Sequence, residues 1–470
     1  MDYRQFIEKN TRKQLKPKLA EMGDLAEMCE ENNKIDPSFY SKYDVKRGLR
    51  DADGHGVLTG LTRISAVNAY KEEGGERVPI DGELLYRGIN VYDLVDGFVG
   101  GKYHGFEETA YLLLFGRLPS ADELTDFTTL LSDNRVLPIN FVRDVIMKAP
   151  SSDIMNSVAR CILTLYSYDP RANDTSIENV LRQCIYLISV FPLLTTYAYR
   201  AYYHCIEGHG LFIHNPSSKL GTAGNILRLM RSDKSFTETE EMILDLMLVL
   251  HAEHGGGNNS TFTTHVVTST GTDTYSAIAA SLCSLKGPKH GGANIKVKEM
   301  FEDMEANIRD VRDEDEICAY LKRILNREAF DGSGLIYGVG HAVYSISDPR
   351  AVLLKRYVEK LCVEKHREDE LTLYKNVDKI ATELLNGRPN QTKPVSVNVD
   401  FYSGFIYDML GIPKEMYTSL FATSRVVGWS AHRIEELINA GKIIRPAYMN
   451  VGDVRKFVPI GERKRASNND

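Results

Sequence analysis

Three short segments of the sequence combine residue types that can move protons. Asp400 stands in the run NVDFYSG, which sets one carboxylate among apolar residues and a glycine. His290 stands in GPKHGGAN and His341 in GVGHAVYSISDPR, so each imidazole lies beside glycines. A carboxylate and two imidazoles can take a proton from carbon and polarise a carbonyl group. Arg350, at the end of the third segment, adds a group that can hold a carboxylate substrate.

An aspartate with the ordinary pKa of ~3.9 is a weak base, so Asp400 needs surroundings that raise its pKa. The nearby Val395, Val397 and Val399 predict an apolar, partly desolvated position that has this effect. The alternative is that Asp400 only caps a helix.

The two histidines invite different roles. Pro288 is typical of a helix N-terminus, so we expect His290 at or just before a helix, where the dipole disfavours the imidazolium. A neutral ring there can donate to a carbonyl while its other nitrogen accepts from the backbone; packing in a turn is the alternative. For His341, the following Asp348-Pro-Arg350 places a guanidinium fork nearby, although the Asp-Pro pair is also a helix cap.

Histidines 251 and 254, in HAEHGGGNNS, suggest a different chemistry. On a continuous helix, positions i and i+3 share a face, so a zinc-dependent hydrolase using these two rings with His265 or His290 is the rival interpretation. The sequence has no CxxC and no HExxH motif to support it, and we expect no metal and no cofactor.

Composition narrows the class of protein. A chain of 470 residues with 43% apolar residues suits two globular domains. The net charge of −7, from 57 basic and 64 acidic residues, disfavours a nucleic-acid partner. The seven cysteines form no CxxC pair, which suits reduced thiols in the cytoplasm.

No segment predicts export or a membrane partner. The first eight residues are too charged for a secretory signal, and Asp2 and Glu8 disfavour a mitochondrial transit peptide. The apolar stretch from Cys184 to Tyr199 is shorter than the ~20 residues of a spanning helix and contains Pro192. We therefore expect a buried helix there and a cytoplasmic location.

The sequence pattern predicts a mainly α fold. Residues 1–45 are charged with apolar positions at helical spacing, which indicates a helical N-terminal extension. Short alternating segments with turn signals between 46 and 90 predict a few strands, and the periodicity after Asp93 is helical. The absence of βαβ alternation argues against a doubly wound sheet.

Taken together, the motifs resemble the citrate synthase family. The segments that carry the resemblance are FEETAYLLLFGRLP (106–119), HAEHGGGNNSTF (251–262), GPKHGGAN (287–294), GVGHAVYSISDPR (338–350) and NVDFYSG (398–404). They occur in the family's order and cover about residues 46–450. The resemblance implies a two-domain helical fold with a large domain at 46–290 and 401–470, and a small domain at 291–400 that closes over the active site.

The resemblance also implies the roles of the site residues. His290 would polarise the thioester carbonyl of acetyl-CoA, Asp400 would remove the methyl proton, and His341 would donate to the ketone oxygen of oxaloacetate. The oxaloacetate carboxylates would be bound by His254, Arg350, Arg425 and Arg445. In the family the last arginine comes from the partner subunit, so a homodimer is expected.

Coenzyme A would be held by the backbone of the loop before His341, which is Leu335, Ile336, Tyr337, Gly338, Val339 and Gly340. The sequence departs from the family at Ser345 and Ile346, where a basic or amide side chain usually binds a CoA phosphate. Lys393 and Lys296 are candidates to replace it. The activity implied is citrate synthase; 2-methylcitrate synthase, which uses propionyl-CoA, is the close alternative, because one methylene discriminates by only ~1–3 kcal/mol.

Overall fold

The computed structural model describes residues 19–463 except 52–53, 342, 390–392 and 440. By their contacts the residues divide into two units, Met1–Thr59 with Ile444–Asp470, and Gly60–Ile443. The first unit contains α2 (Leu19–Asn33), α3 (Ser38–Lys42) and the 3-10 turns η1 (Arg47–Leu49) and η5 (Ile460–Glu462). The helices expected in the N-terminal extension are therefore present from residue 19, and residues 1–18 lie outside the described part.

The second unit is mostly helical, as predicted. Its α-helices are α4 (Val91–Gly101), α5 (Gly105–Phe115), α6 (Ala121–Asp133), α7 (Ile154–Leu165), α8 (Ile177–Cys205), α9 (Thr222–Met230), α10 (Glu238–His251), α11 (Asn259–Thr268), α12 (Thr274–Leu285), α13 (Ala293–Asn307), α14 (Glu314–Leu325), α15 (Pro349–Lys365), α16 (Glu368–Asn386), α17 (Val399–Met409) and α18 (Tyr417–Ile438). The short turns are η2 (Val142–Ile146), η3 (Tyr166–Tyr168) and η4 (Lys414–Met416).

The strands of the described residues form one small sheet near the start of this unit. β1 (Ser65–Glu73), β2 (Glu76–Tyr86) and β3 (Ile89–Asn90) pair antiparallel in chain order, with an irregularity in β1 between Asn68 and Tyr70. β2 also contacts α4, α5 and α15.

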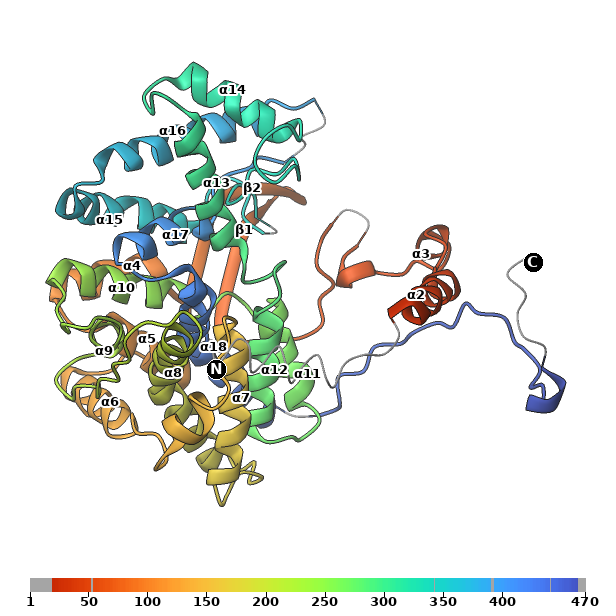
Figure 1. The fold of residues 1–470 in the computed structure, drawn as a ribbon, viewed down its shortest axis with the longest axis horizontal. Coiled ribbons are helices and arrows are strands. Elements are labelled where there is room, and N and C mark those ends of the chain that lie inside the picture. The colour runs from red at the N-terminus through yellow and green to blue at the C-terminus, as the bar shows by residue number, and fades with distance from the viewer. Residues whose placement is uncertain (1–18, 52–53, 342, 390–392, 440, 464–470) are drawn as a thin grey trace. The chain divides into compact units, whose positions relative to one another are not determined.

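Helix α18 is the centre of the second unit. It packs against α5, α8, α10, α11 and α12, and these helices surround it in Figure 1. Almost every residue from Tyr417 to Ile434 is buried, including the large Trp429. A helix that is covered on all sides can present charged side chains inward only where they bind partners, which makes Arg425 and His432 notable.

The long apolar helix is part of this core. The stretch predicted as a buried helix lies inside α8, which runs continuously through Pro192. By length and composition alone α8 could cross a membrane, but 72% of its most apolar window is buried inside the protein. This burial is typical of a core helix.

A second group of helices follows or carries all three predicted catalytic segments. α17 packs against α13 and α15, and α14 and α15 both contact α16 (Figure 1). His290 precedes α13, His341 precedes α15, and Asp400 lies in the first turn of α17. The domain division at 291 and 400 stays a prediction.

Candidate active site

Two loops are tied together so that Asp400 and His341 come from neighbouring backbones. The Gly340 N–H donates to the Ser396 carbonyl at 2.8 Å, and the Asn398 side-chain amide donates to the Gly340 carbonyl at 2.8 Å. These bonds join the loop before His341 to the start of α17. The pairing explains why an asparagine stands two residues before the aspartate.

Asp400 is not the cap of its helix. The Asn398 side chain caps α17 by accepting from the Asp400 N–H at 2.9 Å, so the alternative of Asp400 as a cap is wrong. Burial raises the pKa of the Asp400 carboxyl to about 6, although Arg350 and Arg425 lower it in part. The pKa of about 6 makes Asp400 a far better base near neutral pH than an ordinary aspartate.

His341 is fixed in one tautomer by its own loop. Its Nδ1 accepts from the N–H groups of Val343 at 3.1 Å and Tyr344 at 3.2 Å, so the proton of a neutral ring is on Nε2. The Tyr344 ring stacks on the imidazole with centroids 4.9 Å apart. Burial, followed by the charge of Arg350, lowers the pKa of His341 to about 4, which keeps the ring neutral.

The His341 Nε2 lies 3.5 Å from Nη2 of Arg350. Because both are donors, they satisfy each other poorly and instead converge on one place, which suits an oxygen acceptor of a ligand. A ketone or carboxylate oxygen bound there would receive hydrogen bonds from a neutral imidazole and from a guanidinium.

Arg350 forms an ion pair within the protein that the sequence analysis did not predict. Its Nε and Nη2 donate to the two carboxylate oxygens of Asp348 at 3.0 and 2.7 Å, and both residues are buried. Asp348 also caps α15 by accepting from the Arg350 N–H, so the capping alternative holds as well. This pairing orients the guanidinium and leaves Nη1 and the outer hydrogen of Nη2 for a ligand.

His254 lies beyond the helix that was expected to carry it. α10 ends at His251, whose Nδ1 contacts the Met247 carbonyl at 2.8 Å, and His254 follows in the loop. The prediction that both rings share one helix face is therefore wrong, and the described residues contain no cluster of three or more metal-binding side chains. Burial, then Arg350 and His341, places the pKa of His254 well below its usual range, and its Nε2 is buried without a partner.

Arg425 has the side chain best suited to bind an anion. The side chain is completely buried on α18, its Nε donates to the His251 carbonyl at 2.7 Å, and Nη1 and Nη2 have no hydrogen-bond partner. The guanidinium lies 4.7 Å from the Phe421 ring. Burial lowers its pKa to about 10, with Glu253 opposing this effect. A buried cation with two unpaired nitrogens is suited to an anion.

His290 stands in a turn three residues before α13, as predicted. Its Nε2 lies 3.4 Å from the Ser260 N–H and 3.2 Å from the Ser260 hydroxyl, at the start of α11. The helix terminus that contacts the ring is thus that of α11. Burial, then Arg425, lowers the pKa of His290 to about 4. With Nε2 accepting from the backbone, the proton is on Nδ1, available to a carbonyl oxygen.

The predicted CoA loop has the backbone freedom that the sequence indicated. Gly338 and Gly340 have φ of 79° and 97°, and a Cβ on Gly338 would lie 2.8 Å from Val297. Ile336 is buried, and the Leu335 side chain is exposed.

Of the two positions that depart from the family, Ser345 is buried and Ile346 is exposed. Ser345 shares a 2.9 Å hydrogen bond with the Tyr70 hydroxyl of β1. Of the two lysines considered as replacements, Lys296 forms an ion pair with Glu299 at 2.8 Å and Lys393 is exposed. Their role toward CoA stays a prediction.

The remaining predicted residue, Arg445, is exposed and belongs to the first unit. The site described above is built within the second unit alone. Sequence reasoning did not single out Asn398 and Tyr344, which orient Asp400 and His341. Their positions inside the two motifs were the available signal.

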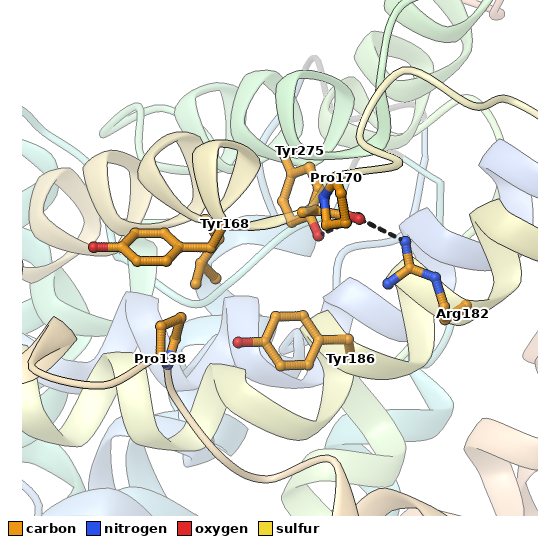
Figure 2. Close-up of a pocket in the computed structure, with 8 residues that line it drawn as sticks. Pro138, Tyr168, Pro170, Arg182, Tyr186 and Tyr275 are labelled. Carbon is orange, nitrogen blue, oxygen red and sulfur yellow. Dashed lines mark hydrogen bonds and ion pairs between the residues drawn. The ribbon is translucent and has the colours of Figure 1, made fainter.

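A pocket of about 170 Å³ lies apart from these residues. It is lined by Pro138, Leu165, Tyr168, Asp169, Pro170, Arg182, Tyr186 and Tyr275. Figure 2 shows its aromatic rings and the contact that Arg182 makes with a neighbouring carboxylate, which is Asp169 at 2.7 Å. None of the predicted catalytic residues lines it.

The structure is that of a mainly helical protein in which partly buried His341 and Asp400 come from neighbouring loops, and comparison with known proteins supplies the family. The sequence model described as "Citrate synthase, C-terminal domain" matches residues 53–447. Citrate synthase from Corynebacterium glutamicum is 34% identical over 458 residues, which cover 94% of this chain and 94% of the relative. A 2-methylcitrate synthase from Shewanella oneidensis is 32% identical, covering 81% and 92%.

A solved structure is similar to this chain as well. The structure of citrate synthase from Thermoplasma acidophilum in a ternary complex with carboxymethyl coenzyme A and oxaloacetate matches with a TM-score of 0.71 and 26% identity, covering 89% of this chain and 99% of that one. The chain belongs to the citrate synthase family. It is an enzyme of the condensing acyltransferase type.

Proposed function

We propose that the chain is a citrate synthase that condenses acetyl-CoA with oxaloacetate and water to give citrate and CoA. The observation that carries the proposal is the combination of two neutral imidazoles and one carboxyl with a raised pKa, together with the buried Arg425 guanidinium, whose Nη1 and Nη2 have no hydrogen-bond partner. These are the groups that an enol intermediate and a dicarboxylate substrate need.

In the proposed first step, Asp400 takes a proton from the acyl methyl carbon. The electrons of the broken C–H bond move toward the thioester oxygen, which His290 stabilises by donating from Nδ1. The Asp400 carboxylate can accept this proton because burial has raised its pKa to about 6.

In the second step, the enol carbon attacks the ketone carbon of oxaloacetate. His341 donates from Nε2 to the ketone oxygen, which gains the charge as the new C–C bond forms. Arg425, Arg350 and His254 bind the carboxylates. Water then cleaves the thioester, and CoA leaves as the thiol.

The close alternative is 2-methylcitrate synthase, which is favoured by the similarity to the Shewanella relative. The same residues would serve propionyl-CoA. A free-thiol assay of CoA release with oxaloacetate tests both: faster release from acetyl-CoA supports the proposal, and faster release from propionyl-CoA supports the alternative. Release of CoA from neither would contradict both.

We also propose that the reaction needs no metal and that the enzyme is a cytoplasmic homodimer in which Arg445 serves the partner's site. Seven free thiols suit a reducing compartment. Activity that EDTA abolishes and zinc restores would contradict the metal-free mechanism.

A further inference from the structure

Four side chains, those of Glu253, His432, His265 and Glu436, form a continuous chain of hydrogen-bonding contacts. His432 Nε2 lies 3.0 Å from Glu253 Oε1, and its Nδ1 lies 3.1 Å from His265 Nε2. His265 Nδ1 lies 2.7 Å from Glu436 Oε2. Glu253 and His432 are completely buried, whereas the side chain of Glu436 is 19% exposed. The chain therefore runs from the interior toward the surface.

Making all three links of this chain as hydrogen bonds needs one proton more than two neutral rings supply. Each of its three links needs one proton between two heavy atoms. Two neutral imidazoles provide two protons, and two carboxylates provide none. One imidazole of the pair His432 and His265 is therefore an imidazolium when all three links are made.

The carboxylate at the inner end is held by several donors. Besides His432, the Ser65 hydroxyl at 3.0 Å and the Gly255 N–H at 2.6 Å donate to the same Oε1 of Glu253. Burial alone would raise the pKa of Glu253, but His432 and Arg425 outweigh it and hold the pKa at about 2. Glu253 is thus an ionised group in the core.

Other charges act on the chain from its neighbours. Glu435 Oε2 lies 3.8 Å from His432 Nδ1, while its Oε1 accepts from the Arg63 N–H. The negative charges of Glu435 and Glu436 favour the extra proton. Burial, followed by the charge of His432, lowers the pKa of His265, which disfavours a second proton on the pair.

Glu253 is the carboxylate that could compete with a substrate for Nη1 and Nη2 of Arg425. It is the foremost charge that acts on Arg425, yet no hydrogen bond joins them within the described residues, and Nη1 and Nη2 stay unpaired. The second oxygen of Glu253 lies against Gly428, where a Cβ would come within 2.2 Å of it. The carboxylate is therefore confined between α18 and its three donors.

We propose that His432, supported by His265 and Glu436, is a positioning residue that holds the Glu253 carboxylate away from Arg425, so that the guanidinium stays available to a substrate carboxylate. The inference rests on the proposed function, because the anion is oxaloacetate. Without the donor on His432, Glu253 turns toward Arg425 and competes with the substrate.

The test measures the KM for oxaloacetate and, by calorimetry without acyl-CoA, its Kd in the full chain. His432→Phe keeps a ring of similar size but removes the donor, and it should raise both constants by roughly tenfold or more with a smaller change in kcat, the scale of one charged contact. Adding Glu253→Gln should restore the affinity, because the neutral amide does not compete for Arg425. A loss of affinity that this second change does not relieve would overturn the proposal.

A second variant tests the proposal at a partly exposed position, in case the buried substitution His432→Phe prevents folding. Glu436→Gln removes one negative charge at the outer end, so the extra proton should be lost at lower pH. Because the positive charge of that proton also attracts the Glu253 carboxylate, the KM for oxaloacetate should begin to rise at a lower pH than in the parent. Glu178→Gln, which makes the same change at an exposed position of α8, is the control. Identical pH profiles of the parent and Glu436→Gln would contradict the proposal.

Nitrogen NMR of the histidine rings separates this inference from the proposed function. In the full chain without substrate, one ring of the pair should carry protons on both nitrogens near neutral pH, and Glu436→Gln should lower the pH at which that proton leaves. Two neutral rings would overturn the chain even if the enzyme is active. An inactive parent that shows the shared proton would instead contradict the proposed function alone.

Discussion

Two carboxyl groups near Arg350, the buried Asp348 and the partly buried Asp400, have pKa values shifted in opposite directions. Burial acts to raise the pKa of both Asp348 and Asp400. Arg350 donates directly to Asp348 and outweighs burial there, so the pKa of Asp348 is lowered. At Asp400 the same guanidinium acts only through its charge, and burial prevails. Asp348 therefore orients the Arg350 guanidinium, whereas Asp400 keeps the basicity that proton abstraction needs.

This difference predicts the pH dependence of kcat/KM. Activity should rise with pH through a pKa of about 6 and then level off, because only the ionised Asp400 accepts a proton. The two histidines, with pKa values of about 4, are already neutral in this range and add no second rise. A pH profile that stays flat from about pH 5 to about pH 7 would contradict the role of Asp400.

The raised pKa of Asp400 also makes the stability of the folded protein depend on pH. Because the pKa of Asp400 in the folded protein lies above its unfolded value, its contribution to stability is fully present below pH ~3.9 and is lost as the pH rises through about 6. The ionised base is thus a stability cost that the surrounding core tolerates.

At the scale of elements, the sheet supports the loop that carries His341. The Gly82 N–H of β2 donates to the Ser347 carbonyl at 3.1 Å. A Cβ at Gly82 would lie 2.1 Å from that oxygen and 2.6 Å from the Tyr344 ring, which stacks on His341. The glycine is needed because the strand and the loop approach too closely for any side chain.

Gly82→Ala should therefore displace the loop and lower kcat/KM, with a loss of stability on the order of 1–3 kcal/mol from overpacking. Gly100→Ala in α4, where a Cβ meets nothing within 4 Å, is the control and should be neutral or slightly stabilising. Thermal unfolding and steady-state kinetics of both variants measure the effect. Equal behaviour of the two variants would contradict a supporting role for the sheet.

The motifs predicted much of this arrangement because each one combines a reactive residue with its local backbone needs. His290 before a helix and the two glycines with positive φ near His341 follow from short-range chemistry. Helix ends are harder to predict, since tertiary contacts decide where α10 stops, and His254 was misplaced for this reason. The link between Glu253 and His432 joins residues far apart in sequence, and no local pattern reveals it.

At the scale of the whole molecule, we propose that Arg445 binds substrate in the active site of the partner subunit of a homodimer. A mixture of Arg445→Ala and Asp400→Asn, each inactive alone, should regain activity when subunits exchange. Mixed dimers would contain one intact site, with Asp400 from the first variant and Arg445 from the second. Exchange without recovery would mean that Arg445 does not act across subunits.

The central claim is that Asp400 is the base of a condensing enzyme, and Asp400→Asn tests it most directly. The amide fills the same volume but cannot accept the proton. We expect calorimetry to show oxaloacetate binding close to that of the parent, while kcat for CoA release falls by roughly 10²–10⁴-fold. Asp122→Asn, at an exposed position of α6, should leave kcat unchanged. Near-normal turnover of Asp400→Asn would contradict the account.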